Sequence, residues 1–366
     1  MSDFISVRLL KPLSRSRLCA LALLTLGLAL SGCSRQSGNF SPLFPTTGAN
    51  TAPNFELEVE PEVELEKVPF YPQRTNHCGP AALATVASFA GAEVDVDQFA
   101  KQVYLPGKEG SLQYDLLGAA RRNNLVPYVI DSDPQAIANL LHQGYPVLVL
   151  QNLGLKILPR WHYAVVIGYQ PKTGHFILRS GNEHRKKVPH KRFLSSWRKA
   201  GAWGVVVLQP EQIPAGIDKS RYLEALTVLE GIARPTTMIR AFEAAAQRWP
   251  SSDRPVVGLG NAYYAAGQLA AAEATFRKLL SLQPQHLVAR NNLAHLLAKR
   301  DCLSAALAEA ELAIRAVDTN HPLWPSLKDT MEEIKALQAI ERSRPPNASP
   351  RNIPGAAPCN DTHERR

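Results

Sequence analysis

Val68-Pro69-Phe70-Tyr71-Pro72-Gln73-Arg74-Thr75-Asn76-His77-Cys78-Gly79-Pro80-Ala81-Ala82-Leu83 places an amide side chain, then a cysteine, before a run of small residues. Because proline has the fixed φ of a first helical turn, this stretch predicts a helix that begins at Cys78 and stops near Gly91. The positive end of the helix dipole should lower the pKa of the thiol and favour the nucleophilic thiolate. Gln73, upstream, is a candidate donor to an oxyanion beside the sulfur. A buried structural cysteine is the alternative interpretation.

Composition limits the function classes that the chain can serve. Its 366 residues are 45% hydrophobic and 20% charged, which is typical of a globular protein with room for two domains and tails. The net charge of +9 is concentrated toward the two ends, and no basic face with interleaved aromatic residues stands out, so nucleic-acid binding is not expected. No Cys or His pairs have a useful metal-ligand spacing, and neither a metal nor another cofactor is expected.

The N-terminal residues 1–32 have the layout of a signal peptide, with basic residues, an apolar run over 18–30 and then small residues. Leu30-Ser31-Gly32-Cys33 resembles the bacterial lipobox, in which the cysteine becomes the lipidated first residue of the mature protein. An ordinary cleavage site is the alternative. The resemblance implies a lipid anchor in a bacterial cell envelope, and the serine after Cys33 favours the outer membrane, facing the periplasm. The polar residues 33–60 are expected to be a flexible linker.

Three cysteines remain beyond the predicted anchor: Cys78, Cys302 and Cys359. An odd number in an oxidising compartment leaves at least one free thiol, and Cys78 is the one with a motif around it. A bridge between Cys302 and Cys359 remains open.

Residues 61–210 show helices first and then a run of strands, the order of an α+β domain. Helices are predicted near 95–100, with Asp95 as cap, over 111–122, with Ser111 as N-cap, over 133–141 and over 191–199. Strands are predicted over 125–130, 146–151, 162–169, 176–180 and 203–208.

A histidine stands at the start of one of these strands. If the following hairpin pairs Tyr169 with residue 175 or 176, His162 lies opposite Asn182 or the residue after it. Ser180 is then one diagonal step away on the same face. An acceptor there would hold one imidazole nitrogen and leave the other for the thiol. A strand-end histidine with an ordinary hydrogen bond is the alternative.

Gln73, Cys78-Gly79-Pro80 and the His162 strand together resemble the papain-like cysteine peptidases that process bacteriocins by removing double-glycine leader peptides. The resemblance covers about residues 67–210 and implies Cys78 as nucleophile, His162 as general base and Gln73 as oxyanion donor. Where the family usually has Asp, this chain reads Arg179-Ser180-Gly181-Asn182. Asn182 is therefore the predicted orienter of His162, and Ser180 is the alternative. Relatives often form the front of ABC exporters, but no phosphate-binding Gly-x-x-x-x-Gly-Lys-Ser/Thr loop occurs, so an exporter is not expected.

Residues 218–342 are rich in Ala and Leu and show a period of 34 residues. The residues that recur at this spacing are Phe242, Phe276 and Ala310, and Ala245, Leu279 and Ala313. The pattern resembles tetratricopeptide repeats, which stack into a concave surface that binds peptides or proteins; an unspecific helical bundle is the alternative. Residues 343–366 are predicted to be a disordered tail.

The predicted fold is an α+β papain-like peptidase domain followed by an all-α tetratricopeptide-repeat domain. The leading hypothesis is a lipid-anchored envelope cysteine peptidase that forms an acyl-enzyme and whose repeats recruit a protein substrate or partner. An inactive peptidase fold that serves as a peptide-binding or scaffold module is the alternative, favoured by the missing Asp. A third hypothesis is another papain-like acyl transferase, such as an amidase or transglutaminase, but Gln73 and the Cys-Gly-Pro start favour a peptidase.

Overall fold

The structure is a computed structural model that describes residues 62–344 and residue 359. The predicted signal peptide, the lipobox with Cys33, the linker 33–60 and nearly all of the predicted tail lie outside the described residues.

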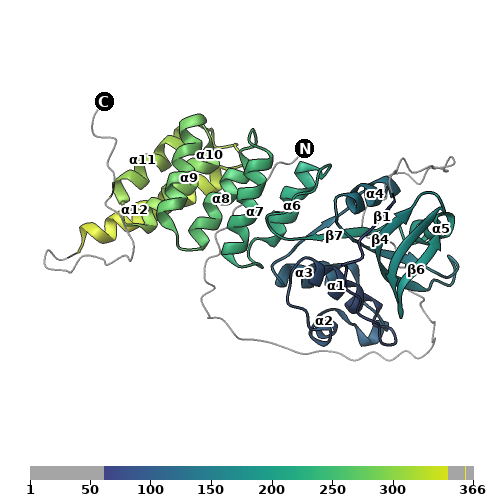
Figure 1. The fold of residues 1–366 in the computed structure, drawn as a ribbon. Coiled ribbons are helices and arrows are strands. Elements are labelled where there is room, and N and C mark those ends of the chain that lie inside the picture. Colours follow the sequence, from purple (N-terminus) through teal and green to yellow (C-terminus); the bar gives the residue numbers. More distant parts are fainter. Residues whose placement is uncertain (1–61, 345–358, 360–366) are drawn as a thin grey trace, which may run out of the picture. The chain divides into compact units, whose positions relative to one another are not determined.

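An antiparallel sheet is the centre of the first domain (Figure 1). Its strands run in the order β2-β7-β3-β4-β5-β6, and β1 pairs with β4 beside this path. The strands are β1 (Val63–Glu64), β2 (Val126–Val129), β3 (Val147–Asn152), β4 (Trp161–Gln170), β5 (His175–Ser180), β6 (Glu183–Pro189) and β7 (Gly204–Leu208). All five predicted strands are present, whereas β6, a strand of mostly exposed basic residues, was not predicted.

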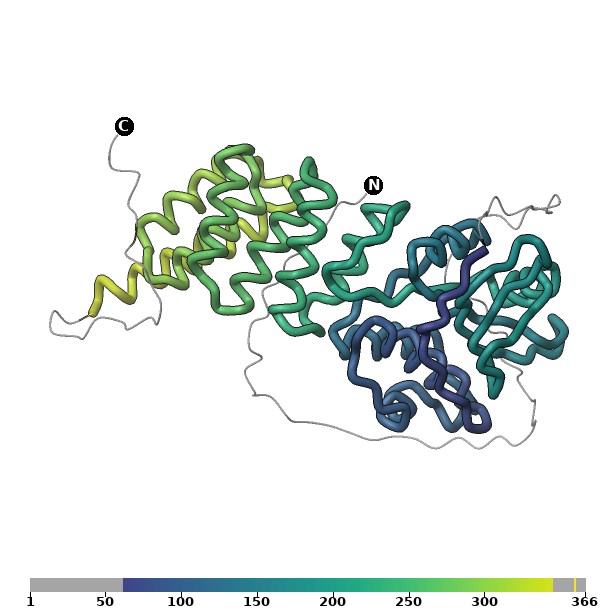
Figure 2. The backbone as a smooth tube through the Cα atoms, viewed as in Figure 1, coloured from purple at the N-terminus to yellow at the C-terminus, as the bar shows by residue number. Residues whose placement is uncertain are grey.

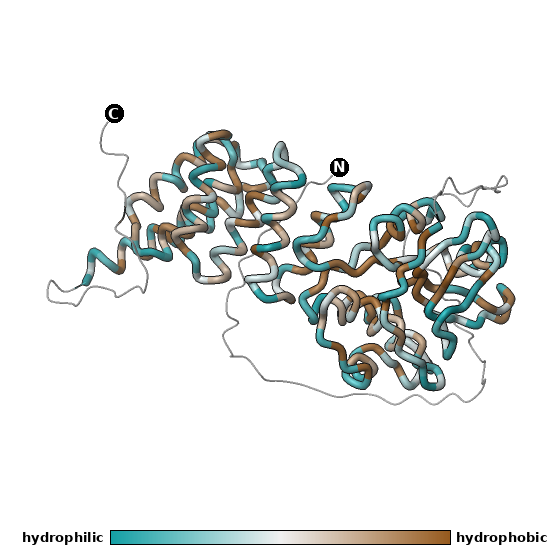
Figure 3. Tube along the Cα trace, in the orientation of Figure 1, coloured by the Kyte–Doolittle hydropathy of each residue, from teal (hydrophilic) through white to brown (hydrophobic). Residues whose placement is uncertain are grey.

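Helices cover both faces of this sheet. They are α1 (Cys78–Phe89), α2 (Val96–Val103), the short 3-10 helix η1 (Pro106–Lys108), α3 (Gln113–Arg122), α4 (Pro134–His142) and α5 (His190–Lys199). Tyr163, Val165 and Ile167 of β4 pack in one core with α1, α2 and α3. Ala164 and Val166 pack in the other core with α4 and α5, because successive residues of a strand point to opposite faces. The central strands are accordingly hydrophobic along their length (Figure 3). The predicted α+β class is confirmed.

The predicted helix caps are partly confirmed. Asp95 and Asp133 accept hydrogen bonds from the first backbone N–H groups of α2 and α4, as capping residues do. The expectation for Ser111 is wrong, because the N-cap of α3 is Leu112. Among the described residues the Ser111 hydroxyl is buried without a hydrogen-bond partner, and it lies where a Cβ on Gly79 would be. Glycine at position 79 therefore lets the start of α1 approach the segment before α3.

The second half of the described chain is a series of antiparallel helices (Figure 2). They are α6 (Lys219–Leu229), α7 (Pro235–Arg248), α8 (Arg254–Ala265), α9 (Leu269–Leu282), α10 (Leu287–Lys299), α11 (Leu303–Arg315) and α12 (Trp324–Arg342). All six residues of the 34-residue period are buried. Phe242 and Phe276 pack against Gly258 and Gly260 of α8, where a Cβ would overlap their rings. Small residues thus let neighbouring helices approach closely, as expected for tetratricopeptide repeats.

The first repeat helices share a core with the sheet domain. Tyr222 and Leu223 of α6 belong to the same buried cluster as the α4 and α5 face of the sheet. The side chain of Asn124, just before β2, accepts hydrogen bonds from the Arg234 backbone N–H (2.9 Å) and the Thr237 hydroxyl (3.3 Å). Arg221 of α6 forms an ion pair with Asp131. The sheet domain therefore continues into the helices without a break in its packing.

Cys302 and Cys359 form a disulfide, so the bridge left open by the sequence is present. It joins the N-terminal end of α11 to a residue 57 positions further along the chain. Cys78 is the free cysteine among the described residues. No helix in residues 62–344 is long and apolar enough to span a bilayer.

Candidate active site

Cys78 is the first residue of α1, as predicted, and its side chain is partly buried at the edge of a surface hollow. The hollow has an empty volume of about 230 Å³, part of it open solvent. Its lining combines the two loops around Gln73 and Gly181 with α1 and strand residues: Phe70, Tyr71, Gln73, Cys78, Ala81, Ala82, Thr85, Tyr163, Arg179, Ser180 and Gly181. Three of the predicted site residues, Gln73, Cys78 and Ser180, therefore surround one space.

Two opposing effects act on the Cys78 thiol. Burial raises its pKa, and this is the larger effect. The backbone N–H groups of Tyr163, Gly79 and Cys78 itself hydrogen-bond the sulfur and lower the pKa by less. The expectation that the helix N-terminus would lower the pKa of Cys78 overall is therefore wrong, because desolvation outweighs the N–H groups. The bond from Tyr163 nevertheless places the sulfur beside the residue that follows His162.

The His162 imidazole is held by Ser180. Its Nε2 lies 2.8 Å from the Ser180 Oγ, and Ser180 itself is buried. The pKa of His162 is lowered to about 4, first by burial and then by the positive charges of Lys186 and Arg160. The imidazole is therefore neutral at pH 7 and able to accept a proton. Within the described residues no hydrogen bond joins it to the Cys78 sulfur.

Asn182 lies away from this contact. Tyr169 pairs with Phe176, and a bulge between Val166 and Gly168 then shifts the β4–β5 pairing by one residue. If the shifted pairing continued along β4, His162 would lie opposite residue 182. The chain instead leaves β5 at Ser180 and turns through Gly181, which has a φ of +63°, and the exposed Asn182. The turn places Ser180, the alternative orienter, against the imidazole, and leaves Asn182 outside the hollow lining.

Gln73 is fixed to the same turn. The backbone N–H of Gln73 donates to the Gly181 carbonyl oxygen at 3.3 Å. Gln73 and Cys78 both line the hollow. This position agrees with the place of an oxyanion donor. The adjacent His77 points elsewhere: its ring stacks on Tyr104 with centroids 4.3 Å apart.

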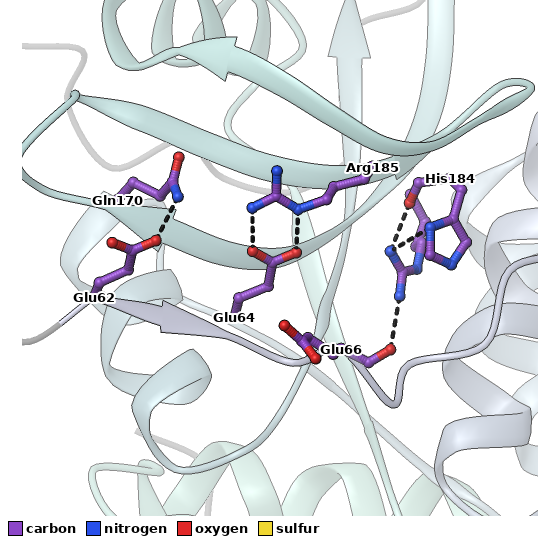
Figure 4. A network of polar contacts seen from close by, with 7 residues as sticks. Glu62, Glu64, Glu66, Gln170, His184 and Arg185 are labelled. Atoms are coloured by element: carbon purple, nitrogen blue, oxygen red, sulfur yellow. Dashed lines mark hydrogen bonds and ion pairs between the residues drawn. The ribbon is translucent and has the colours of Figure 1, made fainter.

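Arg179, which was not predicted from the sequence, lines the hollow and holds the backbone segments around it together. Its buried guanidinium donates to the carbonyl oxygens of Val68 at 2.8 Å, Glu66 at 3.0 Å and His184 at 2.6 Å. Figure 4 shows the Glu66 and His184 ends of this network beside the Glu64–Arg185 ion pair. A buried cation compensated by carbonyl groups ties β5, β6 and the segment that leads to Gln73 into one unit. The only sequence signal was a charged residue inside an otherwise apolar strand.

The comparisons with known proteins agree with this arrangement. Residues 65–205 match the family described as Peptidase_C39 like family, and residues 239–289 match Tetratricopeptide repeat. The α+β sheet domain therefore resembles C39 peptidases, and it is called the C39-like domain below. No curated protein matches the chain.

Solved structures of peptidases are similar to part of the chain. A structure named for a C39-like peptidase from Bacillus anthracis is 18% identical, with 41% of this chain and 98% of that chain covered and a TM-score of 0.34. The double-glycine motif protease of an AMS/PCAT transporter, in complex with the leader peptide, is 20% identical, with 39% and 91% covered and a TM-score of 0.31. The peptidase domain of Streptococcus ComA, a bifunctional ABC transporter, is 24% identical, with 38% and 98% covered and a TM-score of 0.31.

Several reactive side chains lie close together in the C39-like domain. Among residues 62–344 and 359, no cluster of three or more His, Cys, Asp or Glu side chains has the geometry to hold a metal ion. The hollow is lined by a thiol, a hydroxyl and an amide-bearing residue, and the neutral imidazole of His162, which does not line it, contacts the Ser180 hydroxyl. This set suits nucleophilic acyl transfer.

Proposed function

We propose that the chain is a cysteine peptidase that hydrolyses peptide bonds through a Cys78 acyl-enzyme. One observation carries this proposal: Ser180, which lines the same hollow as Cys78, holds the His162 ring with its Oγ 2.8 Å from Nε2. A nucleophile and a neutral base thus lie on α1 and β4, two elements of one domain that Ser180 and the hollow connect.

The proposed reaction begins with the His162 ring in one tautomer. Nε2–H donates to the Ser180 Oγ, which leaves the Nδ1 lone pair to accept the thiol proton. The sulfur then attacks the peptide carbonyl carbon, and the backbone N–H of Cys78 with the Gln73 amide stabilises the oxyanion. The imidazolium returns its proton to the leaving amine. Water, deprotonated by the imidazole, then hydrolyses the thioester, releases the carboxylate and restores the thiol.

The repeats and the N-terminus supply the proposed setting. Tetratricopeptide repeats generally bind proteins or peptides, and here we infer that they recruit a protein substrate or partner. The lipobox-like Leu30-Ser31-Gly32-Cys33 supports the proposal of an envelope protein anchored by lipid, at the outer membrane and facing the periplasm. The Cys302–Cys359 disulfide agrees with an oxidising compartment.

A catalytically inactive, peptide-binding module is the second candidate. The observation that favours it is the environment of the thiol: burial favours its protonated form, and the imidazole has no hydrogen bond to it among the described residues. The alkylation experiment below separates the two candidates.

Alkylation of Cys78 tests the proposal directly. Iodoacetamide should label Cys78 about tenfold or more faster in the wild type than in His162→Ala at pH 7, because only the wild type has a base for the thiol proton. The Cys302–Cys359 bridge removes the other described cysteines from the reaction. Peptide mapping identifies the labelled residue, and His77→Ala is the matched control. Equal rates in wild type and His162→Ala would favour the inactive module.

The pH dependence of peptide cleavage follows from the low pKa of His162. Only the neutral imidazole accepts a proton, and it is neutral above its pKa, so kcat/KM should stay high as the pH falls and decrease near pH 4. Lys186→Met removes a charge that lowers this pKa and should move the acid limb to higher pH by a fraction of a unit. Lys172→Met, at the opposite end of the β4–β5 hairpin, should leave it unchanged. An acid limb at the ordinary histidine pKa would contradict the buried imidazole.

A further inference from the structure

The loop between β3 and β4, which leads directly into His162, exposes several apolar side chains close together in sequence. Leu155, Ile157 and Leu158 are 65%, 91% and 75% exposed, and Leu153 and Trp161 at the two ends of the loop are each 43% exposed. Most other exposed large hydrophobic side chains of the described residues stand singly on separate helices. Five exposed apolar side chains within nine residues mark an interaction surface.

The loop has a defined backbone. The Asn152 Oδ1 accepts hydrogen bonds from the backbone N–H groups of Gly154 (2.9 Å) and Arg160 (3.0 Å), and the Lys199 Nζ donates to the Gly154 carbonyl oxygen at 2.9 Å. A Cβ at Gly154 would overlap the Leu158 carbonyl oxygen, so the loop closes tightly on itself. These contacts hold the apolar side chains outward.

The surroundings of the apolar side chains are cationic. Lys156 and Arg160 are exposed within the loop, and residues 153–161 include no acidic residue. Arg198 and Lys199 lie at the end of α5, whose Lys199 reaches the loop. The loop thus combines exposed aliphatic side chains, Trp161 at its end and lysine and arginine side chains around them. This combination is typical of segments that bind the interface of an anionic bilayer.

We propose that this loop, residues 153–161, inserts its apolar side chains into an anionic lipid surface and so holds the peptidase hollow close to the membrane. The exposure of these side chains favours lipid over a peptide. A bound peptide is usually received in a concave groove, whereas Ile157 and Leu158 project with nine-tenths and three-quarters of their surfaces in solvent. A bilayer interface can close around such a projection. The inference does not depend on catalysis by Cys78.

A fluorescent label on the loop tests this proposal. In the full chain with Cys78→Ala, Ile157→Cys is labelled with an environment-sensitive dye and mixed with phosphatidylglycerol–phosphatidylethanolamine vesicles. The emission should move to shorter wavelength, and doxyl-labelled lipids should quench it. The matched control is Leu282→Cys, because Leu282 of α9 is 73% exposed and both variants carry the same N-terminal segment. The Cys78→Ala parent gives the background labelling.

The outcomes distinguish insertion of the loop into lipid from binding of a peptide. Quenching several-fold stronger at position 157 than at 282, weakened by Lys156→Glu with Arg160→Glu or by phosphatidylcholine vesicles, supports insertion into an anionic surface. Absent or equal quenching at the two positions overturns the proposal. A label at 157 that ignores vesicles but responds to a peptide would assign the loop to substrate binding, and would likewise overturn it.

Discussion

Cys78→Ala should reduce peptide hydrolysis by about 10⁴-fold or more, because it removes the thiol that forms the acyl-enzyme in the proposed reaction. The residual rate would come from substrate binding and the oxyanion-stabilising groups. The Cys78 side chain is only partly buried, so its loss should change the thermal unfolding midpoint little. Initial rates on a peptide library, with melting curves in parallel, measure both effects.

His162 provides the companion variant and a matched control. His162→Ala should lose activity on the same scale, and the Cys78→Ala/His162→Ala double variant should be no worse than either single variant, because the pair acts as a unit. His77→Ala, next to Cys78 in sequence but stacked on Tyr104, should remain near the wild-type rate. Hydrolysis that survives in purified Cys78→Ala would assign the activity to another group or to a contaminant.

Ser180→Ala should reduce kcat by about tenfold to a hundredfold, because the imidazole loses the hydroxyl 2.8 Å from its Nε2 and no longer keeps one orientation. KM should change less than kcat if Ser180 acts through His162. Ser180→Thr keeps a hydroxyl and should recover most of the rate. Steady-state kinetics of the three proteins give the comparison.

Asn182→Ala is the contrasting variant for the same question. Because Asn182 is exposed in the β5–β6 turn, its replacement should leave kcat near the wild-type value. A larger loss in Asn182→Ala than in Ser180→Ala would mean that the turn rearranges in the working enzyme and that the amide orients the histidine.

Local signals in the sequence predicted most of the framework. Pro80 in a first turn located the start of α1, and the apolar run after His162 located β4. The spacing of Phe242 and Phe276 predicted the repeats, because only stacked helices bring both residues against the small residues of α8. These features depend on contacts within or between neighbouring elements, which periodicity can indicate.

Other features depend on tertiary structure that periodicity does not indicate. β6 was missed because its residues are mainly basic and exposed, and its strand conformation is imposed by pairing with β5. The direction of the Cys78 pKa shift was missed because desolvation depends on everything packed around the sulfur. The turn at Gly181 brings Ser180 and not Asn182 to the imidazole, and this geometry depends on a bulge and a turn that periodicity does not indicate.

Because the sheet and the first repeat helices share a core, the choice of end point determines whether a recombinant fragment stays folded and soluble. Similarity to C39-like peptidases ends at residue 205, but Tyr222, Leu223 and the bonded pair Asn124–Arg234 continue the packing beyond it. A recombinant piece that stops at 205 would uncover apolar surface on the α4 and α5 face of the sheet and invite aggregation. A piece carried through α7, to Arg248, keeps that surface covered.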